Sequence, residues 1–210
     1  MKSYIHFIRH GVTEGNANRW FYGWADVNLL PEGREELQRL RDAGTYPPLL
    51  DADCYTSGMR RTEQTFEIIY GDVPHRQIPA MKELNFGQWE CKTWEELKDI
   101  PGIINLLGDM NGTTEYPDGE SPYGFRQRVL GGLEELRGYH RLKELSHRHS
   151  GQDAVSIMVC HGGVISGCMQ HLFPDDKETY WNWLPQPGHG YTVYFEEGEP
   201  VSYEEKGFAG

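Results

Sequence analysis

Runs of apolar residues, each followed by a turn and then by a helical pattern, recur along this chain. Tyr4–Ile8 is a run of β-branched and aromatic residues bounded by Gly11, and we expect a second short strand over Ala52–Thr56. Ala154–Cys160 is apolar at nearly every position, which is typical of a central parallel strand covered on both faces. Such strands, alternating with helices, predict an α/β fold.

The remaining elements follow from helix starts and turn residues. We expect a helix beginning at Pro31, a helix over residues 60–70 capped by Ser57–Met59, a strand over His75–Ala80, a long helix after Ser121 and a buried helix over Val164–Leu172. Gly190–Phe195 and Pro200–Glu204 predict a terminal β-hairpin, in which one strand must run antiparallel to its neighbour. Between residues 90 and 120, short helical patterns broken by glycine and proline indicate a lid-like insertion.

An aromatic loop, Gly15–Asn28, follows the first strand. Its aromatic residues either form a satellite core, which is the more frequent outcome, or a wall of a pocket.

Composition and charge narrow the class of protein. With 210 residues, 38% hydrophobic content and no linker, we expect a single domain over residues 1–210. A net charge of −12 argues against nucleic acid or an anionic membrane as the main partner, because either would require a basic face. The longest apolar runs are too short to cross a bilayer and no apolar leader follows Met1, so we expect a cytoplasmic protein.

Chemically useful residues follow two of the predicted strands. Arg9, His10 and Gly11 follow the first strand, and His161 with Gly162 follows the apolar run that ends at Cys160. In an open α/β sheet, ligands bind in the crevice beyond the carboxyl ends of the strands. Arginine suits a phosphate or carboxylate, and a neutral imidazole is a competent nucleophile. Taken alone, Arg9, His10 and Gly11 could equally well be an Arg-His pair in a surface turn, and the rest of the chain decides between the two interpretations.

Two more charged side chains fall near strand ends. Arg61 lies in the first turn of a helix, where backbone N–H groups and a guanidinium can bind one anion, although an exposed helix charge is the commoner role of a single arginine. Glu83 lies next to Leu84 and Phe86, and partial burial there would let it hold a proton near neutral pH; a solvated loop glutamate is the alternative. Two arginines and two histidines that converge in an acidic protein indicate a site for a phosphate dianion.

Nothing in the sequence indicates a metal or a cofactor. No cluster of carboxylates and no Cys/His spacing is of the kind that holds a metal, and the four cysteines lack a CxxC pair. His147 and His149 are two positions apart, so they do not share a helix face, and we expect them to form an exposed tail. We therefore expect no metal and no cofactor.

Five motifs, in order, resemble those of the histidine phosphatase superfamily, which includes the cofactor-dependent phosphoglycerate mutases. They are Arg9-His10-Gly11 with Thr13 and Asn16 (R-H-G-x-T-x-x-N), Ser57–Thr65 (S-x-L-x-R-A-x-Q-T), Met81–Glu90 (L-x-E-x-x-F-G-x-W-E), Pro117–Ser121 (P-x-G-E-S) and Cys160–Gly163, the second histidine motif. The chain departs from the family pattern at Leu30, where a threonine cap is common, at Thr62, a common alanine, and at Cys91, a usual glycine.

The resemblance implies a three-layer α/β/α sandwich with a mixed, mostly parallel six-stranded sheet. It implies that His10 attacks phosphorus and that Glu83 gives a proton to the departing alcohol. The groups implied to bind the phosphate oxygens are Arg9, Arg61 and His161, with Asn16 and the amides of Gly11 and Gly162 as weaker candidates. No catalytic position of the family is altered in this sequence.

We therefore predict a metal-independent phosphatase that hydrolyses a small phosphorylated metabolite, such as a sugar phosphate or α-ribazole phosphate, through a phosphohistidine. The alternatives are a cofactor-dependent phosphoglycerate mutase and, less favoured, a non-catalytic phospholigand-binding module. We expect no nucleic acid or membrane partner, and a homodimer is the assembly that we consider.

The predicted lid bears on the choice between phosphatase and mutase. Its only basic residues are Lys92 and Lys98, and it lacks the arginine pair that mutases of the family carry. An acidic lid favours a phosphatase whose substrate has a neutral, polar or apolar remainder. Arg19 or Arg126, folding over the pocket, would supply the missing positive charge.

Overall fold

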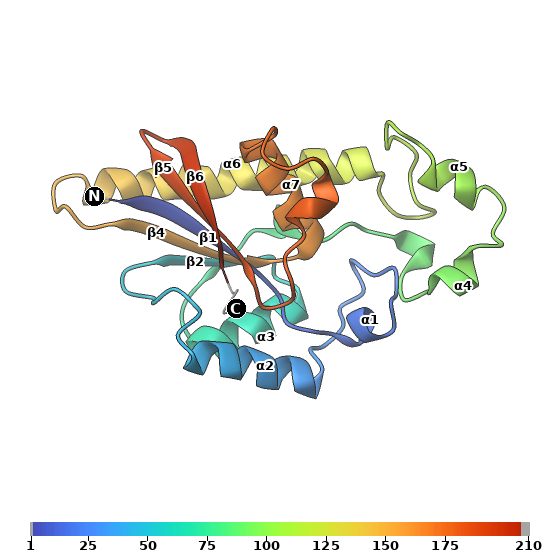
Figure 1. Cartoon of the computed structure of the whole chain (residues 1–210), viewed down its shortest axis with the longest axis horizontal. Coiled ribbons are helices and arrows are strands. Elements are labelled where there is room, and N and C mark those ends of the chain that lie inside the picture. Colours follow the sequence, from blue (N-terminus) through green and yellow to red (C-terminus); the bar gives the residue numbers. More distant parts are fainter. Residues whose placement is uncertain (1, 207–210) are drawn as a thin grey trace.

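A six-stranded sheet lies between two layers of helices in the computed structural model, which describes residues 2–206 (Figure 1). The strands are β1 (Ser3–Arg9), β2 (Asp53–Thr56), β3 (Arg76–Gln77), β4 (Ala154–Cys160), β5 (Gly190–Glu196) and β6 (Glu199–Lys206), in the spatial order β3-β2-β4-β1-β5-β6. All pairs among β1 to β4 are parallel, whereas β5 is antiparallel to both β1 and β6. The predicted mixed, mostly parallel six-stranded sheet is confirmed.

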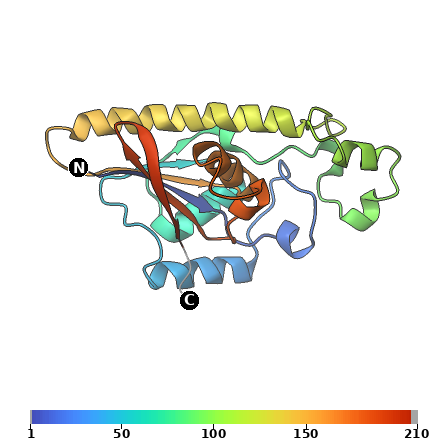
Figure 2. The same ribbon diagram turned by 45° about the horizontal axis from the view of Figure 1, so that its top comes forward.

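The helices cover both faces of this sheet. The α-helices are α1 (Glu14–Ala17), α2 (Pro31–Asp42), α3 (Arg60–Tyr70), α4 (Trp94–Leu97), α5 (Ile103–Leu107), α6 (Pro122–His147) and α7 (Gly162–Leu172), and the short 3-10 helices are η1 (Pro79–Met81), η2 (Gly87–Trp89) and η3 (Tyr180–Trp183). α2 and α3 lie on one face, and α6 and α7 lie on the other (Figure 2). The predicted three-layer α/β/α sandwich is therefore also confirmed.

Strand β4 is the centre of the core, and all seven of its residues are buried. Successive side chains of a strand point to opposite faces, so Ile157 and Val159 join the cluster beneath α2 and α3, while Met158 joins the cluster beneath α6 and α7. In the parallel pairing with β1, Arg9 lies opposite Cys160. The residues that follow, His10 and His161, therefore leave the sheet side by side.

Helix starts agree with the sequence in two places and differ in a third. Ser121 caps α6 by accepting the Gly124 N–H, and α2 begins after Leu30 without a side-chain cap, as its sequence predicts. Helix α3, in contrast, has Met59 at its N-cap without a side-chain bond. The Ser57 hydroxyl accepts the Met59 N–H at 3.3 Å. It also forms a shorter hydrogen bond to His161, the residue that follows β4, so its main contact is with the end of that strand and not with α3.

One expectation holds only in part and another is wrong. The strand predicted over His75–Ala80 shrinks to β3, an exposed two-residue strand at the sheet edge, because Pro79 has no N–H for the ladder and begins η1. His147 is not in an exposed tail: it is buried, and its Nε2 lies 2.9 Å from the Asp51 carboxylate.

The segment of residues 90–120, which we call the lid segment, projects from one end of the molecule and carries α4 and α5 (Figure 1). Its residues Leu97, Ile103 and Tyr116 pack with Trp89 in a small core of their own. Cys91, at the position of a usual family glycine, has a φ of 60°, which is the left-handed region that favours glycine. Within residues 2–206, no helix combines the length and the apolar character that crossing a bilayer requires.

Candidate active site

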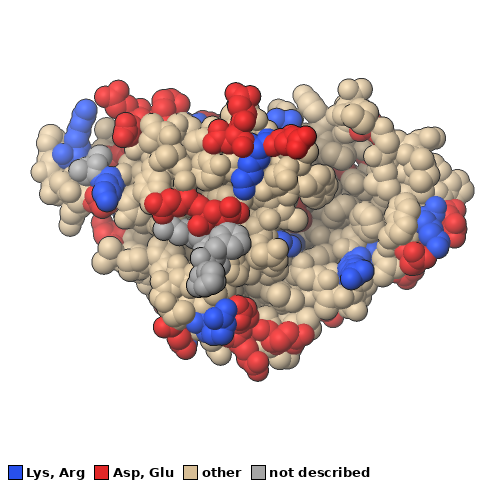
Figure 3. All heavy atoms as spheres, viewed as in Figure 1, with Lys and Arg blue, Asp and Glu red and all other residues tan. Residues whose placement is uncertain are grey.

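A cavity of about 810 Å³ opens at the carboxyl ends of β1 and β4. It is lined by Arg9, His10, Arg61 and Glu83, by the glycines that begin α7, and by aromatic residues. The space-filling view shows a hollow between the part of the molecule that carries α7 and the part that carries α4 and α5, and most acidic side chains visible on this face lie outside it (Figure 3). Four of the five side chains predicted to carry the chemistry therefore meet at one cavity.

His10 is buried and is held in one protonation state by its own backbone. Its Nδ1 lies 2.7 Å from the carbonyl oxygen of Gly11, and since a carbonyl can only accept, Nδ1 carries the proton. The lone pair is then on Nε2, which has no hydrogen-bond partner within residues 2–206. Burial, together with the positive charges of Arg61 and Arg9, holds the pKa of His10 well below its usual range. The imidazole is therefore neutral at neutral pH, as a nucleophile must be.

His161 is also fully buried, but both of its ring nitrogens are engaged. Its Nδ1 accepts the Nε–H of Arg61 at 3.2 Å, so Nε2 carries the proton and donates to Ser57 Oγ at 2.8 Å. Burial and the charge of Arg61 lower the pKa of His161 well below its usual range. The ring lies 5.3 Å from that of His10, yet it does not line the cavity. The expected contact with a phosphate oxygen would require one of these two hydrogen bonds to break.

Arg9 and Arg61 bring two positive charges to the cavity, one half-buried and one fully buried. Arg61 is fully buried and donates to the carbonyl oxygens of Ala25 at 3.0 Å and Gly23 at 2.7 Å. Arg9 donates to the Pro185 carbonyl at 2.6 Å, and its buried Nε–H has no partner in the described part of the chain. Burial lowers the pKa of both groups, but guanidinium remains charged at neutral pH.

Neither of these arginines forms an ion pair with a carboxylate of residues 2–206. Burying an unpaired charge is costly, and such a charge is expected to be compensated by a ligand of opposite sign. Arg9 and Arg61 together therefore favour the binding of an anion at the cavity floor.

Glu83 faces the same cavity from the segment between η1 and η2. One carboxylate oxygen accepts the Gly163 N–H at 2.9 Å and the other accepts the Leu84 N–H at 3.0 Å, which orients the half-buried side chain. A Cβ atom at Gly163, the second position of α7, would lie only 2.4 Å from a Glu83 oxygen, so a side chain there would displace the carboxylate. The Tyr180 hydroxyl donates to the Gly163 carbonyl at 2.6 Å and fixes the same turn.

The three weaker candidates differ in where they lie. Asn16 and Gly162 line the cavity. The Asn16 side-chain oxygen accepts from Thr13 in a capping box, which leaves its amide N–H groups for another acceptor. Gly11, in contrast, does not line the cavity: its amide donates to Thr65 Oγ1 at 3.1 Å, and a Cβ atom there would lie 2.7 Å from the Leu37 side chain. Gly11 therefore serves the packing of α2.

The outer walls of the cavity are largely aromatic. Trp20, Phe21 and Tyr22 line it, and Phe21 also packs on the core of the lid segment, so both interpretations of the aromatic loop hold. The opposite wall includes Tyr180 and Trp181 of η3, a helix that was not predicted. The capping box between Thr179 and Asn182, visible in the sequence as T-Y-W-N, is the signal that would have found η3.

Two further arginines reach the cavity from outside the lid segment. Arg19 and Arg126 are exposed, line the cavity, and have no carboxylate partner within residues 2–206. Both residues named from the sequence as possible sources of positive charge over the pocket therefore lie at the cavity. The lid segment is acidic, but the pocket as a whole carries four arginines, two at its floor and two farther out.

The remaining reactive groups lie apart from the cavity. All four cysteines are free, and burial raises the pKa of Cys160 well above its usual range and that of Cys168 to about 12, so both stay protonated. Among residues 2–206, no three side chains of His, Cys, Asp or Glu form a group that could hold a metal ion.

Comparison with known proteins agrees with the five motifs. The sequence model of the family described as "Histidine phosphatase superfamily (branch 1)" matches residues 5–204. The chain is 31% identical over 186 residues to 6-phosphofructo-2-kinase/fructose-2,6-bisphosphatase 4 of Rattus norvegicus, covering 88% of this chain. It spans only 36% of the length of that relative and of its human and macaque counterparts.

Two other relatives are matched over most of their length. The chain is 26% identical over 189 residues to adenosylcobalamin/alpha-ribazole phosphatase of Escherichia coli (strain K12), covering 86% of this chain and 84% of that protein. The crystal structure of phosphoglycerate mutase from Thermus thermophilus superposes with a TM-score of 0.65 at 25% identity, covering 98% of this chain and 99% of that one. These relatives include both phosphatases and a mutase.

Proposed function

Since the chain belongs to the histidine phosphatase superfamily, we propose that it is a phosphatase that hydrolyses a small phosphomonoester through a phosphohistidine at His10, without a metal ion. One observation carries the proposal. The Nε2 atom of His10, which holds the lone pair, has no partner among the described residues, and His10 lines a cavity together with the fully buried Arg61 and the half-buried Arg9.

In the first step, the lone pair of His10 Nε2 attacks phosphorus while the bond between phosphorus and the leaving oxygen breaks. The Nδ1–H of His10 keeps its hydrogen bond to the Gly11 carbonyl, so the ring keeps its orientation. Arg9 and Arg61 offset the charge of the equatorial oxygens, and because both are already held by carbonyl groups they need little rearrangement. His161 acts through Arg61, whose Nε–H it accepts.

Glu83 supplies the proton that the departing oxygen requires, so the alcohol leaves neutral. The resulting carboxylate then takes a proton from water, and the water oxygen attacks phosphorus as the bond to Nε2 breaks. The products are the alcohol, inorganic phosphate and free His10. The position of Glu83 at the same cavity as His10 supports this double role.

The shape of the cavity supports a substrate larger than phosphate itself. Its volume of about 810 Å³ and its aromatic walls suit an organic remainder with an apolar surface. The phosphatase names among the relatives support hydrolysis, and both a sugar phosphate and an α-ribazole phosphate fit these requirements.

A second candidate function, phosphoglycerate mutase, is supported by Arg19 and Arg126. These exposed guanidiniums line the cavity without carboxylate partners among residues 2–206, and they would suit a second anionic group on the substrate. The acidic lid segment, with only Lys92 and Lys98 as cations, supports the phosphatase instead.

We also propose that the protein works in the cytoplasm on a small phosphorylated metabolite, without nucleic acid or membrane partners. Four free cysteines suit a reducing compartment, and a net charge of −12 would repel anionic polymers and surfaces.

The proposal is tested by measuring phosphate release from a panel of phosphomonoesters in the presence of EDTA. The panel contains sugar phosphates, fructose 2,6-bisphosphate, α-ribazole phosphate and an aryl phosphate. A parallel assay supplies 3-phosphoglycerate with catalytic 2,3-bisphosphoglycerate and follows 2-phosphoglycerate against free phosphate. We expect release from the panel in EDTA and little isomerisation. Isomerisation much faster than phosphate release would establish the mutase, and loss of all release in EDTA would contradict the metal-free reaction.

A further inference from the structure

Glu83, the acid of the proposed function, lies outside regular secondary structure. The segment that carries it runs from the end of η1 at Met81 to the start of η2 at Gly87, so no helix or strand ladder holds its backbone. A proton donor must nevertheless be placed within hydrogen-bond reach of the leaving oxygen, and small displacements reduce the rate strongly. The contacts of this segment therefore decide how well Glu83 can act.

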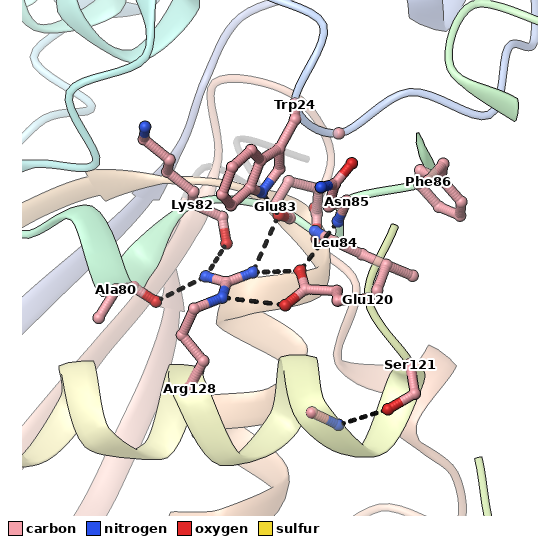
Figure 4. Close-up of polar contacts among 12 residues, drawn as sticks. Trp24, Ala80, Lys82, Glu83, Leu84, Asn85, Phe86, Glu120, Ser121 and Arg128 are labelled. Atoms are coloured by element: carbon pink, nitrogen blue, oxygen red, sulfur yellow. Dashed lines mark hydrogen bonds and ion pairs between the residues drawn. The ribbon is translucent and has the colours of Figure 1, made fainter. Parts of the chain in front are cut away.

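Arg128 of α6 binds the backbone on the N-terminal side of Glu83. Its Nη1 donates to the carbonyl oxygens of Ala80 and Lys82, each at 2.9 Å, and its Nη2 donates to the carbonyl of Glu83 itself at 3.1 Å (Figure 4). One planar guanidinium thus holds three carbonyl groups within four residues. Lysine, with a point charge, could not reproduce this fork.

Glu120, the last residue of the lid segment, holds the C-terminal side. Its Oε1 accepts the Asn85 N–H at 2.9 Å, and its own N–H donates to the Asn85 carbonyl at 3.0 Å. Its two carboxylate oxygens form an ion pair with Arg128, through Nε at 3.1 Å and through Nη2, and Figure 4 shows the two side chains facing each other beside the segment. Both side chains are only about a fifth exposed, at 22% and 20%, so the pair is shielded from solvent.

We infer that Arg128 and Glu120 form a clamp that positions Glu83, and that this clamp ties the place of the proton donor to the end of the lid segment. All of these side-chain contacts fall on residues 80–85, on both sides of the acid. The Trp24 indole N–H adds a further bond to the Glu83 carbonyl at 2.9 Å. The inference rests on the proposed role of Glu83, and neither Arg128 nor Glu120 touches the reacting atoms.

The test compares Arg128→Lys and Glu120→Gln with Glu83→Gln on two substrates, an alkyl phosphate and p-nitrophenyl phosphate. A displaced acid matters when the leaving group needs a proton, so we expect kcat for the alkyl phosphate to fall about ten- to 100-fold. For the activated aryl phosphate we expect less than about a threefold change, with KM little altered for both. Combined with Glu83→Gln, Arg128→Lys should add almost no further loss.

Arg137→Lys is the matched control. Arg137 is a largely buried arginine of the same helix, with an ion pair to Glu134 and a bond to the Gly198 carbonyl, but it contacts no residue of the segment around Glu83. Its replacement removes a comparable fork, and we expect no difference between the two substrates. If Arg137→Lys shows the same difference in kcat loss between the alkyl and the aryl phosphate, the effect comes from a general loss of stability and the inference is overturned.

Amide hydrogen exchange over residues 82–86 separates the inference from the proposed function. We expect faster exchange there in Arg128→Lys and Glu120→Gln but not in Arg137→Lys. Unchanged exchange, or equal losses on alkyl and aryl phosphates, would show that the clamp does not position Glu83. If exchange rises as expected while Glu83→Gln itself shows no difference between the substrates, the proposed acid role fails although Arg128 and Glu120 still hold the segment that carries Glu83.

Discussion

The Nε–H of Arg61 donates to Nδ1 of His161 at 3.2 Å, so the lone pair of His161 helps to hold the guanidinium of Arg61 in place. The other two arms of the guanidinium end on the carbonyl groups of Gly23 and Ala25. Arg61 therefore joins the end of β4 to the aromatic loop that forms one wall of the cavity. Its charge is fixed in place before any ligand arrives.

This geometry predicts that Arg61→Lys is not a conservative change. Lysine keeps the charge but cannot satisfy three acceptors in one plane, so the charge should be displaced and the Nδ1 atom of His161 left without its donor. We expect kcat/KM for an aryl phosphate to fall by about 10²-fold or more. Arg60→Lys, at the exposed neighbouring position of α3, is the control and should change the rate little. Near-normal activity of Arg61→Lys would contradict the assignment.

Glu83→Gln should slow turnover according to the leaving group. Glutamine keeps the shape of the side chain but cannot give a proton, so we expect about 10²-fold or greater loss for alkyl phosphates and a much smaller loss for p-nitrophenyl phosphate. If water activation also depends on Glu83, phosphoenzyme should accumulate in rapid-quench experiments. Equal losses for both substrates would mean that Glu83 only shapes the cavity.

Acid should destabilise the protein through His140, which does not line the cavity. Its ring is buried between Ser3 Oγ and Ser156 Oγ, and burial followed by the charge of Lys143 lowers its pKa from 6.5 to about 4. As pH falls below about 6.5, the unfolded chain binds a proton that the folded His140 does not, so the free energy of unfolding decreases until about pH 4 and then levels off. Above about pH 6.5 this group contributes no pH dependence.

His140→Gln should remove part of this acid dependence, by up to about 3 kcal/mol between pH 6.5 and 4, because a shift of one pKa unit corresponds to about 1.4 kcal/mol. Urea unfolding at a series of pH values measures it. His149→Gln, at an exposed position near the end of α6, is the control and should leave the pH profile unchanged. An identical profile for His140→Gln and the parent protein would refute this source of acid sensitivity.

Cys91→Gly should stabilise the protein. Cys91 has a φ of 60°, and a side chain in this left-handed region costs about 1 kcal/mol, part of which is offset by the greater freedom of glycine in the unfolded chain. We expect the free energy of unfolding to rise by up to about 1 kcal/mol with unchanged turnover. Lower stability of Cys91→Gly would mean that the packing of the thiol outweighs the backbone strain.

The sequence predicted the fold well where the pattern was local. The apolar runs of β1 and β4 located the centre of the sheet. Because these strands pair in parallel, the residues that follow their carboxyl ends, His10 and His161, lie side by side. The strand at His75–Ala80 was overestimated, because its apolar content belongs partly to the turn at Pro79. The lid segment was located by its glycines and prolines, although its two short helices were not assigned bounds.

The sequence predicted which candidate side chains meet at the cavity better than it predicted the contacts that hold them. Ser57 was interpreted as a helix cap, but its hydroxyl bonds to His161, 104 residues away. Arg128 lies 45 residues from Glu83, and no spacing rule links a residue in a long helix to the backbone of a distant loop. The burial of His147 against Asp51 likewise depends on which surface the end of α6 meets. Such contacts arise from tertiary packing, which single-sequence patterns do not contain.

The central claim is that His10 becomes phosphorylated during turnover. The protein is mixed briefly with a 32P-labelled aryl phosphate and quenched in base, and the labelled peptide is identified by mass spectrometry. We predict acid-labile, base-stable label on His10 Nε2, with loss of both label and turnover in His10→Ala. Label on another residue, or turnover and labelling retained by His10→Ala, would contradict the account.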